Sequence, residues 1–222
     1  MYIDYTSQEP GVMGYLSNDQ NLINAYQSGD IYIHTAKLFG TVPDTATKQS
    51  HPEERQIYKV LYLANSYGQG AYAVAQSLNC SVSHAKFLQK KYKEIYNKYF
   101  TWVGGFIEAG LQKKYLTTVY GWQRHVKSLF TIKEGKRKHI HNSLLNWPIQ
   151  SHGAEILRKA LIDLTDAHFE VCALVHDAVL IQIPIPEFNQ RLEEAKQIMV
   201  DASIKVVGGP IRVDHEVIKS IY

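Results

Sequence analysis

The sequence has few cysteines, no long apolar run and no strong excess of either charge. Only two of its 222 residues are cysteine, Cys80 and Cys172. They lie far apart and lack a C-x-x-C partner, so neither a disulfide framework nor a cysteine zinc site is expected. No apolar run approaches the roughly 20 residues that cross a bilayer, and the first residues lack the basic and apolar segments of a secretory leader. We therefore expect a reducing, cytoplasmic setting and no membrane contact.

The composition is that of a folded protein whose charge permits contact with nucleic acid without demanding it. Hydrophobic residues make up 45% of the chain and charged residues 20%, which is enough apolar material for a sizeable core. Lysine and arginine total 24 against 21 acidic residues, a formal net charge of +3. Much of the local basic charge lies in 112–115 and 133–141, and Lys133–Lys138 is either a solvated loop or a phosphate contact.

Hydrophobic periodicity predicts many helices and few strands. Pro10 and Gly11 indicate a turn after the first strand, and Asn18 is the expected N-cap of the first helix. Gly104 and Gly105 interrupt the middle region. The expected helices are 19–27, 31–39, 53–64, 72–78, 82–98, 148–166 and 187–206, and the expected strands are 2–5, 117–120, 171–175, 179–183 and 211–215. This pattern predicts an α+β fold, with a small antiparallel sheet and a large helical part.

Two aspartates stand at the ends of predicted strands. Asp4 lies in the first strand, and Asp177 lies at the tip of a hairpin between two apolar strands that we expect to be buried. An aspartate in such a turn is commonly only a local hydrogen-bond acceptor. A pair of carboxylates on adjacent strands, however, suits Mg²⁺, which takes one or two protein carboxylates and completes its shell with substrate phosphates. Two such ions form the centre of many phosphoryl-transfer sites.

Two cations and an aromatic residue follow one another along the helix predicted over 53–64. Arg55 and Lys59 are four residues apart, and Tyr67 lies about 18 Å from Arg55 along the axis at 1.5 Å per residue. A triphosphate could lie along the two cations with a base stacked on the aromatic ring. The alternative is a solvated basic face that ends in a packed tyrosine.

Five segments in order resemble the C-terminal part of family A DNA polymerases, the bacterial polymerase I and phage-type group. Asp4–Glu9 resembles motif A, an aspartate followed by tyrosine and, five residues on, by glutamate. Arg55–Gly68 resembles motif B, R-x3-K-x7-Y-G, with both gaps intact. His176-Asp177 resembles motif C. Tyr120–Arg124 and Asn146–Gln150 resemble two further family segments, so the likeness covers nearly the whole chain.

This resemblance implies a DNA-templated DNA polymerase and assigns the residues of its reaction centre. Asp4 and Asp177 are implied to bind two Mg²⁺ ions, and Glu9 to act as the steric gate against a ribose 2′-hydroxyl. Arg55 and Lys59 are implied to hold the β- and γ-phosphates of the deoxynucleotide, and Lys59 also to donate a proton to the leaving pyrophosphate.

The remaining implied residues contact the primer–template DNA. Tyr67, followed by Gly68, is implied to stack near the template base. Asn146 and Gln150 resemble positions that contact the minor groove, where acceptors are common to all correct base pairs. The last two implied DNA-binding residues are Arg124, in the fourth family segment, and His176, which would support the primer terminus. For Asn146, Gln150 and His176 a packing role is the alternative.

The sequence departs from the family at several positions. Leu63 replaces the usual aromatic residue four positions after Lys59, which puts sugar stacking in doubt. Asn142 stands where an arginine usually contacts the duplex, and Ala178 follows the motif C aspartate where glutamate is usual. We expect the loss of that glutamate to tune activity and not abolish it.

Only three residues precede Asp4. We therefore expect palm and fingers alone: palm over 1–30, fingers over 31–115 and palm again over 116–222. We expect the chain to be half of a split polymerase or a truncated product. We also expect its first strand to leave a sheet edge unpaired. An N-terminal fragment carrying thumb and exonuclease is the expected partner.

Two other functions remain open from the sequence. One is a non-catalytic DNA-binding remnant or a subunit of a polymerase assembly, which the absence of a thumb favours. The retained Asp4, Asp177, Arg55 and Lys59 argue against it. The other is a two-metal phosphodiester hydrolase, which needs further clustered aspartate or histidine ligands that the sequence does not show.

Overall fold

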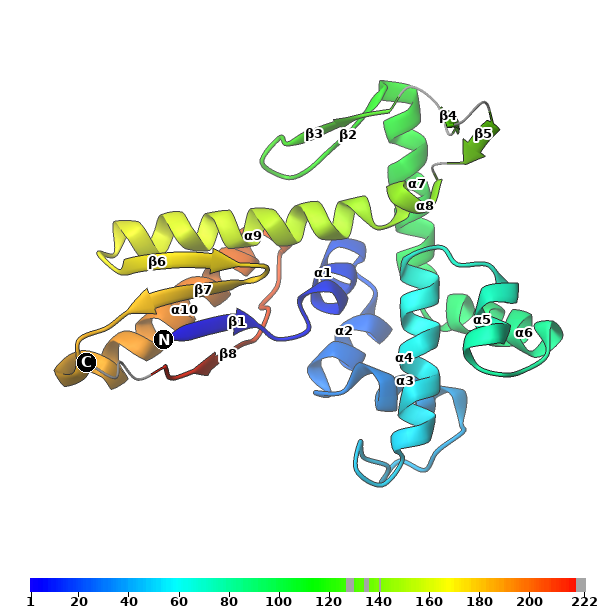
Figure 1. Cartoon of the computed structure of the whole chain (residues 1–222), viewed down its shortest axis with the longest axis horizontal. Coiled ribbons are helices and arrows are strands. Elements are labelled where there is room, and N and C mark those ends of the chain that lie inside the picture. Colours follow the sequence, from blue (N-terminus) through cyan, green and yellow to red (C-terminus); the bar gives the residue numbers. More distant parts are fainter. Residues whose placement is uncertain (127–129, 134–135, 140, 219–222) are drawn as a thin grey trace. The chain divides into compact units, whose positions relative to one another are not determined.

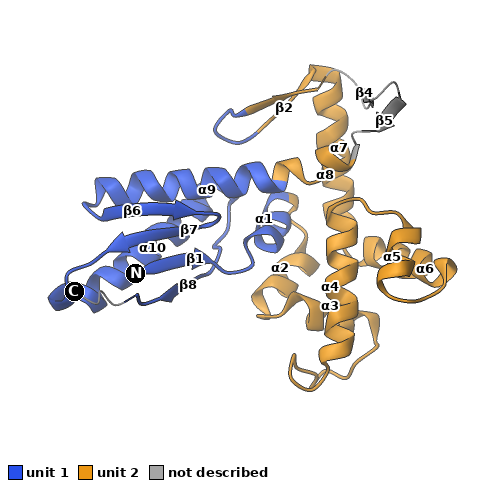
Figure 2. Cartoon of the chain, viewed as in Figure 1, with its two compact units in different colours: residues 1–16, 118–122, 149–222 blue, residues 17–117, 123–148 orange. Residues whose placement is uncertain are grey.

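The computed structural model describes residues 1–126, 130–133, 136–139 and 141–218. The chain comprises two compact units (Figure 2). Unit 1 comprises residues 1–16, 118–122 and 149–222, and unit 2 comprises residues 17–117 and 123–148. In the described part of the chain, no helix combines the length and the apolar character needed to cross a bilayer.

Unit 1 is built on a four-stranded sheet whose neighbouring strands all run antiparallel (Figure 1). The strand order is β6 (Glu170–Val175), β7 (Ala178–Gln182), β1 (Tyr2–Tyr5) and β8 (Val213–Glu216). The expectation that β1 leaves an unpaired edge is wrong, because β7 and β8 pair with its two sides. The edges of this sheet are β6 and β8.

Helices complete the core of unit 1. They are α1 (Gln8–Ser17), α9 (Trp147–Asp166) and α10 (Phe188–Val207), with a 3-10 turn at Ile185–Glu187 before α10. Ile3 and Tyr5 alternate with half-buried neighbours along β1 and are themselves almost fully buried. The Tyr5 hydroxyl donates to the carbonyl of Met199 on α10 at 2.7 Å, so this face of β1 is turned to α10. Asp4 therefore lies on the opposite face.

The motif C hairpin is confirmed in its position, but only one of its strands is buried. Val179 and Ile181 on β7 are at most 1% exposed. Leu174 and Val175 on β6 are 40% and 43% exposed, because β6 is an edge strand and has a neighbour on one side only. Pro10 was also misread: it lies in the first turn of α1, where a missing N–H costs no helical hydrogen bond.

Unit 2 is helical, with two short antiparallel strand pairs. Its helices are α2 (Gln20–Gln27), α3 (Ile31–Phe39), α4 (Pro52–Ser66), α5 (Ala71–Ser77), α6 (Val82–Ile95), α7 (Asn97–Lys113) and α8 (His141–Leu145). Its strands β2 (Tyr115–Thr117) and β3 (Gln123–His125) form one hairpin, and β4 (Phe130–Lys133) and β5 (Lys136–His139) form another. The mixture of a helical unit with an antiparallel sheet confirms the α+β prediction.

Tyrosines fill much of the core of unit 2. Tyr92, Tyr96 and Tyr99 are at most 2% exposed. The Tyr92 and Tyr96 rings meet edge to face with centroids 4.9 Å apart, and the Tyr96 hydroxyl lies 2.7 Å from the Thr35 hydroxyl. The bond between the two hydroxyls ties α3 to the junction of α6 and α7.

Asp19 and not Asn18 caps α2. Its Oδ1 accepts hydrogen bonds from the backbone N–H of Asn21 and Leu22, and its Oδ2 accepts one from the N–H of Tyr99. Asp19 is only 2% exposed, so this carboxylate satisfies N–H groups of two helices inside the core. Asn18 instead has a left-handed backbone, with φ of 51°.

Four other element predictions from the sequence differ from the structure. The single helix expected over 82–98 is two helices, and α7 continues through Gly104 and Gly105, where no other atoms would touch an added Cβ. The strand expected over 117–120 lies earlier, in β2. The loop expected over Lys133–Lys138 includes ends of β4 and β5, and residues 134–135 lie outside the described residues.

Candidate active site

Asp4 and Asp177 lie at the same end of the unit 1 sheet. Asp4 is opposite Ala178 of β7 in the antiparallel register, and Asp177 immediately precedes Ala178 in the turn. The backbone N–H of Tyr5 donates to the Asp177 carbonyl at 3.4 Å, which ties β1 to this turn. The sequence prediction that two strand-end carboxylates would be neighbours therefore holds as geometry.

A third carboxylate, Asp214, faces Asp4 from the other side. It lies directly opposite Asp4 in the pairing of β1 with β8, so the two side chains project from the same face of the sheet. Burial, followed by the negative charges of Asp177 and Asp214, raises the pKa of Asp4. Sequence reasoning missed Asp214, since it predicted the last strand but not which strand would pair with it.

The donor set at this end of the sheet fits a divalent cation that other groups also bind. The described residues contain no group of three or more histidine, cysteine, aspartate or glutamate side chains placed to hold a metal by themselves. Asp4 and Asp177 form a pair close enough to interact electrostatically. Such a pair suits Mg²⁺, which keeps waters and takes phosphate oxygens as further ligands.

Glu9 and Gln150 meet within unit 1. Glu9 lies in the first turn of α1, and Gln150 is an exposed residue near the start of α9. The side-chain amide of Gln150 donates to Oε1 of Glu9. A residue expected to exclude a 2′-hydroxyl and one expected to contact the minor groove are thus held together, so each limits the rotamers of the other.

His176 is exposed and occupies a strained backbone position. Its φ is 58°, the left-handed region that non-glycine residues seldom adopt. Together with Asp177 it forms the two-residue turn between β6 and β7. The turn therefore presents both side chains beyond the strand ends.

The motif B residues form one stripe along α4, in which Lys59, Leu63 and Tyr67 are exposed and Arg55 is half-buried. Arg55, Lys59, Leu63 and Tyr67 follow at intervals of four residues, so they lie along one side of the helix. Leu63 is 39% and Tyr67 43% exposed, whereas Leu61, Tyr62 and Ala64 on the other side are buried. Ile57 is 38% exposed, whereas its neighbour Tyr58 is buried.

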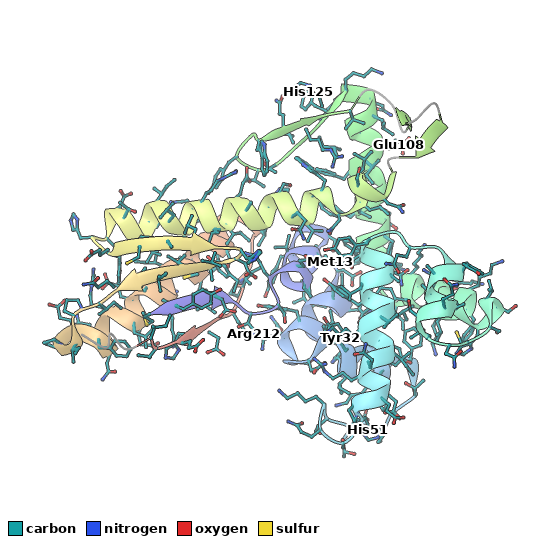
Figure 3. The ribbon with its side chains drawn as sticks, viewed as in Figure 1. Met13, Tyr32, His51, Glu108, His125 and Arg212 are labelled. Atoms are coloured by element: carbon teal, nitrogen blue, oxygen red, sulfur yellow. The ribbon has the colours of Figure 1, made fainter. Side chains whose placement is uncertain are left out.

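Asp30 and Tyr32 hold the guanidinium of Arg55, a pair of contacts that sequence reasoning missed. Arg55 Nε lies 2.6 Å from Oδ2 of Asp30, and its guanidinium lies over the Tyr32 ring at 4.9 Å from the centroid. Tyr32 on α3 lies next to α4 (Figure 3), with its ring 5.8 Å from that of Tyr62. The sequence marks Asp30 only as a typical N-cap for the helix predicted from residue 31, which does not indicate a contact with Arg55.

Gly68 ends motif B at a place where a side chain would not fit. Its φ is 65°, and an added Cβ would lie 2.6 Å from Oδ1 of Asn142. The Asn142 amide donates to the Gly68 carbonyl at 2.9 Å. Asn142, which stands where the family usually has arginine, therefore holds the turn after α4.

In unit 2, Arg124 is hydrogen-bonded within the protein and Asn146 is buried. The two Nη atoms of Arg124 donate to the carbonyl and hydroxyl of Ser143 at 2.8 and 2.9 Å. Burial lowers the pKa of the Arg124 guanidinium. Asn146 is 8% exposed in the bend between α8 and α9.

The predicted residues thus form two sets. Asp4, Glu9, Gln150, His176 and Asp177 belong to unit 1. The second set belongs to unit 2 and comprises Arg55, Lys59, Leu63, Tyr67, Gly68, Arg124 and Asn146. In unit 1 the two carboxylates lie at one end of the sheet, and in unit 2 the motif B residues lie along one side of α4.

Comparison with known proteins gives one consistent result. The chain is 28% identical over 203 residues to thermostable DNA polymerase I of Thermus thermophilus, covering 89% of this chain and 24% of that protein. It is 27% identical to DNA polymerase I of Bacillus caldotenax, covering 96% of this chain and 24% of the relative. The chain therefore spans about a quarter of the length of these relatives.

A solved structure and a family model agree with these relatives. The structure is the POL domain of Pol1 from M. smegmatis in complex with DNA primer-template and dNTP, with a TM-score of 0.81 and 27% identity. The match covers 96% of this chain and 38% of the solved one. The model of DNA polymerase family A matches residues 1–221. The chain belongs to DNA polymerase family A.

Proposed function

We propose that this chain carries the reaction centre of a DNA-templated DNA polymerase, which transfers a nucleotide from a deoxynucleoside triphosphate to a primer 3′-hydroxyl. The observation that carries the proposal is the placement of Asp4 and Asp177 at one end of the sheet in a member of this family. The stripe of Arg55 and Lys59 on α4 supports it, since it offers two cations at a spacing that suits a triphosphate.

In this proposal, the carboxylates of Asp4 and Asp177 hold two Mg²⁺ ions. When bound, the ions lower the pKa of the attacking hydroxyl and neutralise charge on the leaving group. The protein's own part is to orient both carboxylates from β1 and the adjoining turn. Burial and the negative charges of Asp177 and Asp214 raise the pKa of Asp4, so its ionised form is unfavourable in this position. A bound cation offsets this cost.

Arg55 and Lys59 bind the β- and γ-phosphates in this proposal, and Lys59 protonates the pyrophosphate as it leaves. Asp30 orients Arg55 by accepting from Nε, which directs the two Nη groups away from that bond. Tyr67 stacks near the template base. Leu63 supplies an apolar contact in place of the aromatic ring usual in the family, so sugar stacking at this position is weaker.

The remaining residues select the sugar and hold the DNA. Glu9, fixed by Gln150, fills the space that a 2′-hydroxyl would need. Gln150 and His176 are exposed and contact the primer–template. Three further residues affect DNA binding less directly. Arg124 donates its hydrogen bonds to Ser143, and Asn146 is buried. Gly68 shapes the turn after α4.

We also retain the assignment of 1–30 and 116–222 to the palm and of 31–115 to the fingers. A further polypeptide segment with thumb and exonuclease is the proposed partner for tight duplex binding, because the relatives are about four times as long as this chain. The alternative of a non-catalytic DNA-binding subunit predicts DNA binding that does not depend on Asp177.

Primer extension tests the proposal. The purified chain is given primer–template DNA, deoxynucleotides and Mg²⁺, beside an Asp177→Ala variant. We expect extension by the wild type and a loss of at least about a hundredfold in the variant, because one of the two carboxylates of the site is removed. An Asp201→Asn variant, which removes an acidic side chain on α10, is the matched control and extends like the wild type.

Two outcomes contradict the proposal. Extension that survives in Asp177→Ala shows that the sheet-end carboxylates are not the reaction centre. DNA binding without extension, with or without an added thumb-bearing segment from a relative, favours the non-catalytic subunit.

A further inference from the structure

A basic pocket lies at the N-terminal end of α4 in unit 2. Its volume is about 560 Å³. One side of it comes from α3, where Asp30, Ile33, His34 and Lys37 follow at helical spacing. The remaining lining residues belong to the turn before α3, to the segment before α4 and to α4 itself; they are Ser28, Gly29, Ala46, Thr47, Lys48, Gln49 and Arg55.

The charges of this pocket are not balanced by the protein. Arg55 and Asp30 neutralise each other through their ion pair. Lys37 and Lys48 make no ion pair or side-chain hydrogen bond with any residue that the structure describes, so the lining keeps an excess of two positive charges. Burial, and then the charge of Lys37, lower the pKa of His34, which leaves its imidazole neutral at pH 7.

Two cations in a concave site favour a small anion with more than one negative oxygen. Lysine binds phosphate groups as a point charge, and Thr47 adds a hydroxyl and His34 an imidazole as hydrogen-bonding groups. The Asp30 carboxylate does not oppose such a ligand strongly, because Arg55 and the first N–H groups of α3 already engage it.

The position of the pocket relative to the motif B stripe indicates which anion it takes. Arg55 belongs to both, whereas Lys59 and Tyr67 do not line the pocket. In the proposed function Arg55 holds the terminal phosphates of the nucleotide, so these phosphates lie on the rim of the pocket.

We infer that Lys37 and Lys48 form a binding site for inorganic pyrophosphate beyond Arg55, which receives the leaving group of nucleotidyl transfer. This inference rests on the proposed function for its biological role. In the reaction, the primer oxygen bonds to the α-phosphorus, the bond from that phosphorus to the bridging oxygen breaks, and the pyrophosphate carries the electron pair away. Lys37 and Lys48 then bind the released anion while Arg55 becomes available to the next nucleotide.

Calorimetric titration with inorganic pyrophosphate in EDTA tests the site without any need for polymerase activity. The variant is the double substitution Lys37→Gln and Lys48→Gln. We expect its dissociation constant for pyrophosphate to rise at least about tenfold, since both phosphate-contacting charges are removed. The matched control substitutes Lys98 and Lys113 on α7 by glutamine; both are exposed and line no part of the pocket, so its constant stays within about twofold of wild type.

Parallel titrations with dTTP and with a single-stranded oligonucleotide separate the possible sources of phosphate. An equal loss in both double variants, or no binding of pyrophosphate to the wild type, overturns the inference. So does a loss for the oligonucleotide alone, which assigns the lysines to the DNA backbone. Loss of pyrophosphate binding only in the Lys37/Lys48 variant supports the site even when primer extension fails, so the two proposals fail separately.

Discussion

Asp30 performs two structural tasks with one carboxylate, and substitution separates them. Its Oδ1 accepts from the N–H groups of Tyr32 and Ile33, each at 3.1 Å, which caps α3. Its Oδ2 accepts from Arg55 Nε at 2.6 Å. An asparagine at this position keeps the cap, because asparagine is as good an N-cap as aspartate, but presents an amide N–H₂ group toward Arg55. An alanine loses both interactions.

The expected losses of stability follow from the two contacts. Loss of an N-cap costs about 1 kcal/mol. The side chains of Arg55 and Asp30 are 32% and 19% exposed, so solvent screens their ion pair, and we assign it about 1 kcal/mol. Asp30→Asn should therefore lower the free energy of unfolding by about 1 kcal/mol and Asp30→Ala by about 2 kcal/mol. For a chain of this size, the corresponding decreases in Tm are about 3 °C and 6 °C.

Thermal unfolding followed by far-ultraviolet circular dichroism measures these changes. Asp44→Asn, which removes the same charge from an exposed loop residue, is the control and leaves Tm unchanged. A double-mutant cycle with Arg55→Gln isolates the ion pair. Equal losses in Asp30→Asn and Asp30→Ala, or a coupling energy of zero with Arg55, would refute the reasoning. In primer extension, Asp30→Asn should raise KM for the deoxynucleotide more than it lowers kcat, because Asp30 only positions Arg55.

Three further predictions concern unit 1 and α7. Asp4→Asn should raise Tm at pH 7 in EDTA, because burial and two facing aspartates raise the pKa of Asp4. Ionisation of Asp4 destabilises the fold as pH rises from about 3.8 through the raised pKa. The Tm values of wild type and Asp4→Asn should therefore coincide only below that range. Coincidence across the whole range would contradict the assignment. Gly209→Ala should cost about 1–3 kcal/mol in urea unfolding, since its Cβ would lie 2.1 Å from the Tyr15 ring. Gly104→Ala, in open space on α7, should stabilise by up to about 1 kcal/mol, and a loss there would show hidden packing.

Local patterns predicted the parts of the fold that depend on neighbouring residues. The hairpin around His176 and Asp177 follows from two apolar runs with a polar tip, and the spacing of Arg55 and Lys59 places them on one side of α4. Glycine misled the prediction in α7. Gly104 and Gly105 weaken a helix by entropy, but buried Tyr99 and Val103 hold this segment helical through tertiary packing.

The contacts that the sequence did not predict join residues from distant segments. Asp30 and Arg55 are 25 residues apart, and nothing local to either shows that α3 and α4 pack together at that point. The prediction that β1 leaves an unpaired edge was wrong for the same reason. Strand pairing depends on which apolar faces share a core. The sequence of a four-residue strand does not indicate whether the strand is paired on one side or on both.

The register of β1 also explains why Ala178 is compatible with a carboxylate site that usually has glutamate there. Ala178 is fully buried opposite Asp4, so a glutamate at that position would place a second negative charge directly across from Asp4. Asp214 already does so from β8, and its side chain is 80% exposed, which lowers the cost of its charge. Alanine at 178 thus adds no further negative charge to those of Asp177 and Asp214 beside Asp4. The sheet end keeps Asp177 and Asp214 near Asp4, and a cation bound there would offset their repulsion of the Asp4 charge.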